Sequence, residues 1–330
     1  MANSPLKIFG IVASATIGVA SAAYGAQTMI IKSLTSNEVD FEFRASEQIE
    51  VITRDGSKIV VYRDVPDIKS TQSEEIKKPT ILFMHGYALC SPIWSFQFDL
   101  LRDKYDLVSI DLRGHGASTV GDNGINLKSF ADDVYDIIES LKLDDIVIVG
   151  HSTGGVIALS YMKEHNEHSE KHIKGLCLVS TLVQPPYNNQ KNLSDALSGF
   201  SLAGKALHTL SSIQAFGYPM ARFAMGKKAS SSSIEFVRRS ISSIDSEVSN
   251  EILRMLLHFS FTEELENFKG KSCVIVGGSD PITPNSDAIF VAELLGGEVD
   301  IIDGVGHVPM LESPDEFNEI LENFLDNIGE

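Results

Sequence analysis

The feature that most constrains the fold is residues 147–155, an apolar run that passes directly into a tight turn. The turn has the pattern Gly-x-Ser-x-Gly, with Gly150, Ser152 and Gly154 at its defining positions. A side chain at either glycine would collide with neighbouring backbone, and the serine would adopt strained backbone angles that project its hydroxyl above the sheet. Residues 156–162 continue with helical spacing. The sequence therefore predicts a strand, a turn with a projecting serine, and a helix.

Because serine is a weak nucleophile at neutral pH, catalysis by Ser152 would require a base and a residue that orients the base. Asp280 follows a predicted strand over residues 272–276 and lies in a loop with two prolines. His307 follows a predicted strand over residues 298–302, in a glycine-flanked loop. The chain order serine, aspartate, histidine is one in which such triads occur. We predict a catalytic triad of Ser152, Asp280 and His307.

Attack on a carbonyl also requires hydrogen-bond donors for the oxyanion that forms. A third predicted strand, residues 80–84, is followed by His85, Gly86 and Tyr87. Gly86 allows a sharp turn that would aim the backbone N–H of Tyr87 into the site, and the N–H of Thr153 would be the second donor. We expect the side chains of both donors to line the pocket. For His85, which precedes the turn, we expect a structural role in bracing neighbouring loops.

Together these landmarks resemble the α/β-hydrolase superfamily, in the branch of small esterases, lactonases, monoacylglycerol-lipase-like enzymes and cofactor-free perhydrolases. The matching segments are His85-Gly86, the loop 111–116, the turn 150–154, Asp280 and His307. The resemblance covers roughly residues 49–325 and is specific for the fold but only weakly for the substrate. It implies no catalytic role for the loop 111–116. Ser152 stands where haloalkane dehalogenases and epoxide hydrolases carry an aspartate, which disfavours both activities.

Strand and helix patterns alternate from residue 80 onwards, with helices expected over residues 93–103 and 127–141. This alternation predicts an α/β fold with a mostly parallel sheet and helices on both faces. Upstream, residues 47–53 and 58–63 flank Asp55-Gly56 and are typical of a hairpin. Between residues 182 and 271 the alternation stops, and the pattern predicts helices over residues 193–210, 213–225, 234–244 and 248–261. In relatives an inserted helical cap occupies this place. Its apolar residues would form a roof over Ser152, suited to an acyl chain or an aromatic group.

The N-terminus departs from the hydrolase pattern, because residues 8–31 contain no charged residue. About 20 apolar residues can cross a bilayer, so an uncleaved membrane anchor is one interpretation. A secretory signal peptide with a cleavage site at Ala20-Ser21-Ala22 is the second, and a weakly structured extension is the third. The first two predict membrane attachment or export of a soluble catalytic domain. We expect five parts: an anchor or signal segment 1–32, a spacer 33–46, the first part of the hydrolase core 47–183, a helical cap 184–271 and the second part of the core 272–330.

The net charge and the cysteine content limit which binding partners and cofactors the chain can have. The formal net charge of −18 argues against nucleic acid or an anionic membrane surface as an electrostatic partner. Three cysteines without paired spacing provide neither a disulfide framework nor a metal-ligand cluster. The sequence implies no metal and no organic cofactor, and it leaves the oligomeric state open.

The motifs predict a serine hydrolase that forms an acyl-enzyme on Ser152. The expected substrate is a carboxylic ester, a lactone or a similar small apolar acyl compound. Acyl transfer, perhydrolysis and carbon–carbon bond hydrolysis would use the same triad, and the sequence does not separate them. A non-enzymatic ligand receptor on the same fold is disfavoured, because this chain retains all three triad residues.

Overall fold

The computed structural model describes residues 43–66, 79–185, 210 and 212–328 of the chain. The predicted N-terminal segment 8–31 lies outside these residues, as does the predicted helix 193–210 except for its last residue. Within the described ranges, no helix is both long and apolar enough to span a membrane.

Eight strands form one sheet in the order β1-β2-β4-β3-β5-β6-β7-β8. The strands are β1 (Glu47–Ile52), β2 (Lys58–Asp64), β3 (Thr80–Met84), β4 (Asp106–Ile110), β5 (Ile146–His151), β6 (Ile173–Val179), β7 (Lys271–Gly277) and β8 (Val299–Ile302). The first two form the predicted hairpin, and β2 pairs antiparallel with β4. All further neighbours pair in parallel, which confirms the predicted mostly parallel sheet.

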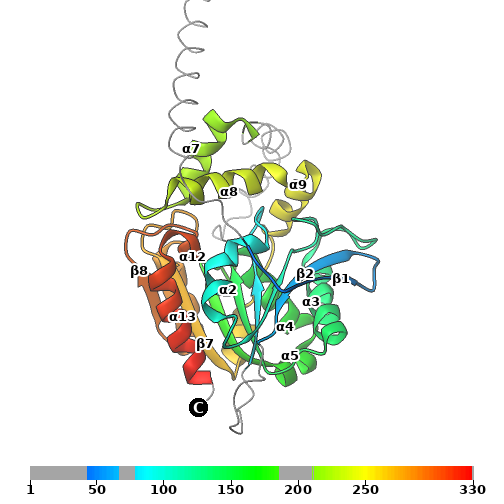
Figure 1. Cartoon of the computed structure of the whole chain (residues 1–330). Helices are drawn as coiled ribbons and strands as arrows, with labels where there is room; N and C mark the ends of the chain where they lie inside the picture. Colours follow the sequence, from blue (N-terminus) through cyan, green and yellow to red (C-terminus); the bar gives the residue numbers. More distant parts are fainter. Residues whose placement is uncertain (1–42, 67–78, 186–209, 211, 329–330) are drawn as a thin grey trace, which may run out of the picture.

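Helices cover both faces of this sheet (Figure 1). The helices of the core are η2 (Ser91–Trp94), α2 (Ser95–Leu101), α3 (Leu127–Leu141), α4 (Thr153–Glu164), α5 (Asn166–His172), α11 (Asn285–Leu294), α12 (Pro309–Glu312) and α13 (Pro314–Ile328). Successive residues of a strand point to opposite faces. Leu82 and Met84 accordingly pack with α3, α4 and α11, whereas Ile81 and Phe83 pack with α2 and α13. The sheet therefore separates two hydrophobic cores, and the turn at Ser152 follows one of its central strands, β5.

The sequence predicts the boundaries of α3 correctly but not those of α2. Helix α3 begins after Asn126, whose side chain accepts the N–H of Ser129 at 2.9 Å, an N-cap that is readable from sequence. The predicted helix 93–103 instead begins with the 3-10 turn η2, which has Pro92 in its first turn, and α2 ends at Leu101. Proline fixes φ and favours the first turn of a helix, so this helical segment starts earlier than the apolar spacing indicates.

Between β6 and β7 the described residues contain four helices and no strand. These are α7 (Gln214–Ala224), α8 (Ser231–Ser243), α9 (Ser246–Met255) and α10 (Thr262–Asn267). Figure 1 shows α7, α8 and α9 beyond one end of the sheet. The prediction of one helix over residues 248–261 is wrong, because α9 ends at Met255. The N–H of Phe261 donates to the carbonyl of Val183 at 3.0 Å, and this contact with the segment after β6 replaces a helical hydrogen bond.

Candidate active site

Ser152 lies at the tight turn between β5 and α4, with φ 50° and ψ −116°. Few residues other than glycine have positive φ, so the backbone of this serine is strained. Its N–H donates to the carbonyl of Val179 at 2.8 Å. A Cβ on Gly150 would come within 2.6 Å of the backbone of α4, and a Cβ on Gly154 within 2.2 Å of the carbonyl oxygen of Met84. Both glycines are therefore required by close packing, as the motif predicts.

Asp280 and His307 come from the loops after β7 and β8 and lie together. The Nδ1 atom of His307 is 2.8 Å from Oδ2 of Asp280. The other carboxylate oxygen accepts the N–H groups of Ile282 at 2.8 Å and Thr283 at 3.0 Å. Burial raises the pKa of Asp280, but the hydrogen bonds from His307 and the two amides outweigh it, so this pKa lies below its ordinary value. An ionised carboxylate in this position holds the imidazole with its proton on Nδ1.

His151 connects the His307 loop to the turn. Its Nε2–H donates to the main-chain carbonyl of His307 at 2.8 Å, and the centroids of the two rings are 5.0 Å apart. Burial lowers the pKa of His151 to about 3, so the ring is neutral at neutral pH. His307 therefore lies against the residue that precedes Ser152.

The hydroxyl of Ser152 has no hydrogen-bond partner among the described residues. A hydrogen bond between a catalytic serine and its histidine often forms fully only when substrate binds.

The loop after β3 passes directly beside Ser152. A Cβ on Gly86 would lie 3.2 Å from the Cβ of Ser152. The N–H groups of Tyr87 in this loop and of Thr153 at the start of α4 have no acceptor within the described part of the chain. The first amides of a helix have no partner inside the helix, which explains the free N–H of Thr153. Both predicted oxyanion donors are thus available for a new hydrogen bond.

The buried side chains of His85 and His115 support this loop through hydrogen bonds to the main chain. The Nε2 atom of His85 accepts the N–H of Leu112 at 3.0 Å, so its Nδ1–H donates to the carbonyl of Gly86 at 2.8 Å. The Nε2 atom of His115 accepts the N–H of Ala88 at 3.1 Å. Burial lowers the pKa of His85 to about 4 and that of His115 to about 3, so both rings stay neutral. These contacts confirm the expected bracing role of His85.

Comparison with known proteins shows the family to which the chain belongs. Residues 81–320 match the sequence model described as Alpha/beta hydrolase family. This chain is a member of that family. It is 25% identical over 266 residues to a non-heme chloroperoxidase from Kitasatospora aureofaciens, covering 74% of this chain and 91% of the relative. It is 30% identical over 135 residues to epoxide hydrolase 1 from Caenorhabditis elegans, which is 40% of this chain and 33% of the relative.

The fold is likewise shared with a solved structure, that of a thermophilic esterase from Thermogutta terrifontis. The TM-score is 0.71 at 19% sequence identity, and the match covers 86% of this chain and 100% of that one. The alpha/beta hydrolase fold predicted from sequence is confirmed, and the family identifies the protein as a hydrolase.

The inserted helices of this hydrolase contact the loops around Ser152. The hydroxyl of Tyr87 lies 2.5 Å from Oγ of Ser249 on α9. Burial raises the pKa of Tyr87, so its hydroxyl is neutral. A Cβ on Gly114 would come within 2.6 Å of the side chain of Val248, so α9 also packs on the loop 111–116. Helix α9 of the inserted segment is therefore attached to the core through Tyr87 and the loop 111–116.

Glu312 is a residue of the site that the sequence did not reveal. Its buried carboxylate accepts the N–H groups of Gly306 and Val308, each at 3.0 Å, and these two residues flank His307. It also accepts the N–H of Gly226, in the segment between α7 and α8, at 2.5 Å. Burial raises the pKa of Glu312. One carboxylate therefore connects the loop that carries His307 to the inserted helices.

A second contact joins the same two segments, because the N–H of His307 donates to the carbonyl of Ala224 at 2.8 Å. The only sequence signal for Glu312 is an acidic residue that directly follows the apolar run 308–311. Its three partners are main-chain amides, and the one that joins it to the inserted helices, Gly226, is 86 residues away in the chain. Sequence spacing alone could therefore not identify it.

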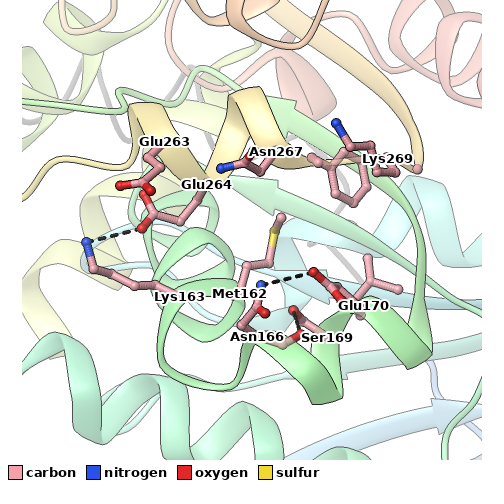
Figure 2. A pocket seen from close by; sticks show the side chains of 12 residues that line it. Met162, Lys163, Asn166, Ser169, Glu170, Glu263, Glu264, Asn267 and Lys269 are labelled. Atoms are coloured by element: carbon pink, nitrogen blue, oxygen red, sulfur yellow. Dashed lines mark hydrogen bonds and ion pairs between the residues drawn. The ribbon is translucent and has the colours of Figure 1, made fainter.

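A cavity of about 390 Å³ lies at the end of α4 remote from Ser152, where α4, α5 and α10 meet (Figure 2). Its wall includes an ion pair between Lys163 and Glu264, with 3.1 Å between Nζ and Oε1. None of the three predicted triad residues lines it. Since α4 rises about 1.5 Å per residue, roughly 15 Å of helix separates Ser152 from this cavity. It is therefore not the pocket in which Ser152 would meet a substrate.

Proposed function

We propose that this alpha/beta hydrolase is a serine hydrolase that cleaves a carboxylic ester, a lactone or a similar small apolar acyl substrate. One observation carries the proposal. The Asp280–His307 pair, with its 2.8 Å hydrogen bond, is held by His151 beside the strained turn of Ser152. A strained serine, a histidine and an orienting carboxylate are the three parts that nucleophilic catalysis by serine requires.

The proposed reaction has two halves. In the first, Oγ of Ser152 attacks the carbonyl carbon while Nε2 of His307 takes the hydroxyl proton. The N–H groups of Tyr87 and Thr153 stabilise the oxyanion, each by roughly 3 to 4 kcal/mol in comparable sites. His307 then returns the proton to the departing alkoxide, and an acyl-enzyme remains on Ser152. Asp280 keeps the imidazole in the tautomer that this transfer needs and stabilises its charged form.

In the second half, water attacks the acyl carbonyl and His307 takes one of its protons. Collapse of the tetrahedral intermediate breaks the bond to Oγ, which recovers its proton from His307, and the carboxylic acid leaves. Each proton transfer in this scheme is carried by His307 and water. The proposal therefore includes no metal or organic cofactor in the reaction.

The substrate class is supported by the inserted segment and by the relatives. Residues 184–271 contain several Phe, Tyr and Met residues, and an apolar wall suits an acyl chain or aromatic group. The similar fold of the Thermogutta terrifontis esterase supports ester hydrolysis. The similarity to the chloroperoxidase supports a second candidate, transfer of the acyl group to peroxide through the same acyl-enzyme. We do not propose epoxide opening, because an aspartate nucleophile would be expected where this chain has Ser152.

The test is hydrolysis of p-nitrophenyl esters of increasing acyl-chain length, with and without hydrogen peroxide. We expect wild-type turnover with a chain-length preference, and a Ser152→Ala variant that is slower by several orders of magnitude. Ser279→Ala is the matched control, because Ser279 is exposed and adjoins Asp280. Peracid formation would identify the second candidate. Undiminished turnover by Ser152→Ala would exclude the proposed mechanism.

We also propose that residues 8–31 determine location rather than catalysis, because every proposed site residue lies beyond residue 49. A chain that begins at Thr35 should be soluble and retain esterase activity. Full-length protein should partition with membranes, or the mature N-terminus should lie near Ala23 if the segment is a cleaved signal. An intact N-terminus in the soluble fraction would contradict both outcomes.

A further inference from the structure

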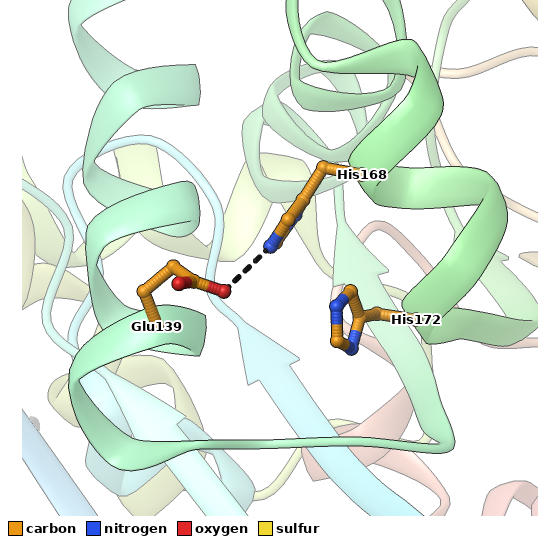
Figure 3. Close-up of side chains that lie close together, drawn as sticks. All are labelled: Glu139, His168 and His172. Carbon is orange, nitrogen blue, oxygen red and sulfur yellow. Dashed lines mark hydrogen bonds and ion pairs between the residues drawn. The ribbon is translucent and has the colours of Figure 1, made fainter.

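We propose that Glu139, His168 and His172 form a zinc-binding site at the edge of the core remote from Ser152. Glu139 lies on α3 and the two histidines on α5, and Figure 3 shows the three side chains facing one another between these helices. One ligand atom from each residue lies within 4.8 Å of the other two. His168 and His172 are four residues apart on a helix, a spacing that places both imidazoles on the same face.

Both imidazoles are oriented as zinc ligands usually are, with one ring nitrogen held by an outer partner. The Nδ1 atom of His168 lies 2.6 Å from the hydroxyl of Tyr161, and its Nε2 lies 3.0 Å from Oε1 of Glu139. The Nδ1 atom of His172 lies 3.1 Å from Oδ1 of Asp144, which leaves Nε2 for a metal. The hydroxyl of Tyr161 can accept the Nδ1–H of His168, which leaves Nε2 of that ring to face Glu139.

Neighbouring rings hold the ligands in place. The rings of His168 and His172 have centroids 4.5 Å apart, and the ring of Tyr135 on α3 lies 4.4 Å from that of His168. The side chains of His168 and His172 are only 15% and 11% exposed, whereas that of Glu139 is 55% exposed. The two nitrogen ligands are therefore preorganised, and the carboxylate faces solvent, from which a metal ion and a water ligand can enter.

Two imidazole nitrogens and a carboxylate oxygen favour zinc as the bound ion. Zinc is bound in proteins by imidazole nitrogen and carboxylate oxygen at about 2.0 to 2.2 Å, often with water as a fourth ligand. Tetrahedral ligands at such distances are about 3.4 Å apart, so the 3.0 Å between His168 and Glu139 needs only a small adjustment. The ligand atom of His172 lies within 4.8 Å of the other two, so it would move closer by up to about 1.4 Å on binding. Magnesium prefers oxygen ligands alone and is not expected here. The carboxylates of Glu139 and Asp144 together would balance the charge of one zinc ion.

Such a zinc ion would act on stability and not on the reaction. Its ligands come from two helices, and Asp144 adds the loop between α3 and β5. His172 directly precedes β6, whereas Ser152 follows the carboxyl end of the neighbouring parallel strand β5. The site therefore lies at the opposite end of the parallel strands from Ser152. Binding should raise the unfolding temperature, since a ligand that binds only the folded state stabilises it.

The test is titration of full-length, chelator-treated protein with zinc chloride by calorimetry, together with thermal unfolding. We expect one zinc ion per chain, a higher unfolding temperature and an unchanged rate of ester hydrolysis. Glu139→Gln is the informative variant, because Glu139 is exposed and its loss should not prevent folding. We expect it to weaken zinc binding at least tenfold and to reduce the thermal shift at the same zinc concentration.

Glu167→Gln is the matched control, because it removes the same charge from an exposed position on α5 outside the cluster. Its zinc affinity should equal that of the wild type, and magnesium should give no thermal shift. Equal weakening by Glu139→Gln and Glu167→Gln would mean that zinc binds the acidic surface diffusely, and the proposal would fail. It would also fail if Glu139→Gln bound zinc as tightly as the wild type.

Discussion

Replacement of Glu312 by alanine tests how the His307 loop is held in place. The change removes the acceptor for the buried N–H groups of Gly226, Gly306 and Val308. A buried donor without a partner costs about 1 to 3 kcal/mol. The three costs do not simply add, and removing a buried carboxylate recovers part of its desolvation cost. We therefore expect a loss of about 3 to 5 kcal/mol in the free energy of unfolding.

The same variant should also be slower as an enzyme. Without Glu312, His307 keeps its contacts with Asp280 and His151 but loses the support of both flanking residues. A displacement of about 1 Å at a catalytic group can reduce the rate about 100-fold. We expect kcat to fall with a smaller change in KM, because the change displaces His307 and removes no group that is proposed to bind the substrate. Urea unfolding and ester kinetics on one preparation measure both effects.

Glu316→Gln is the control for this experiment, since Glu316 lies in the first turn of α13 and is half-exposed in its ion pair with Lys228. It should leave both stability and kcat unchanged. Glu312→Gln keeps the shape of the side chain but turns an amide NH₂ towards main-chain donors, so it should fall between wild type and alanine. A Glu312→Ala variant that unfolds at the same urea concentration as the wild type would refute the proposed stabilisation by Glu312. Loss of stability with an unchanged kcat would reduce Glu312 to a structural residue.

Two further predictions concern buried charge. Ionised Asp280 stabilises the fold above its ordinary pKa of 3.8, and this contribution is lost as the pH falls through its lower folded-state pKa. The difference in unfolding free energy between wild type and Asp280→Asn should therefore shrink below pH 3.8, and a pH-independent difference would contradict this. Arg113, with its side chain 1% exposed, pairs with Asp133 and Asp55, so Arg113→Met should cost about 3 to 5 kcal/mol in denaturant unfolding. Arg54→Met breaks a partly exposed ion pair with Asp136 and should lower the free energy of unfolding by less than about 1 kcal/mol. Equal losses in Arg113→Met and Arg54→Met would contradict the expectation that the buried pairs matter more.

The sequence predicts those parts of the fold that depend on local patterns. Strand β3 and helix α3 have the predicted boundaries, because a continuous apolar run and an amphipathic period with an N-cap are local signals. The sequence also predicts the role of Gly150 and Gly154 in the turn, because the motif itself indicates that backbone approaches them closely. The chain order of Ser152, Asp280 and His307 indicated a shared site, and in the structure Asp280 and His307 form a hydrogen-bonded pair.

What the sequence could not predict depends on partners distant in the chain. Glu312 gains its place from the amide of Gly226, 86 residues away. The break between α9 and α10 follows from the hydrogen bond of Phe261 to Val183, while the apolar pattern continues through it. Helix α5 is polar throughout, so no amphipathic period marks it. The cluster of Glu139, His168 and His172 also cannot be predicted from sequence. The cysteine count gives no sign of a metal site, and the three side chains come together only when α3 and α5 pack.

The central claim is that Ser152 becomes acylated, and fluorophosphonate labelling tests it most directly. The full-length protein is treated with the probe, digested and mapped by mass spectrometry, beside the Ser152→Ala and His307→Ala variants. A single adduct on the peptide that contains Ser152 is predicted, absent from Ser152→Ala and formed far more slowly in His307→Ala, because the base is then missing. An adduct on another serine of the wild-type protein, or undiminished labelling of Ser152→Ala, would contradict the account.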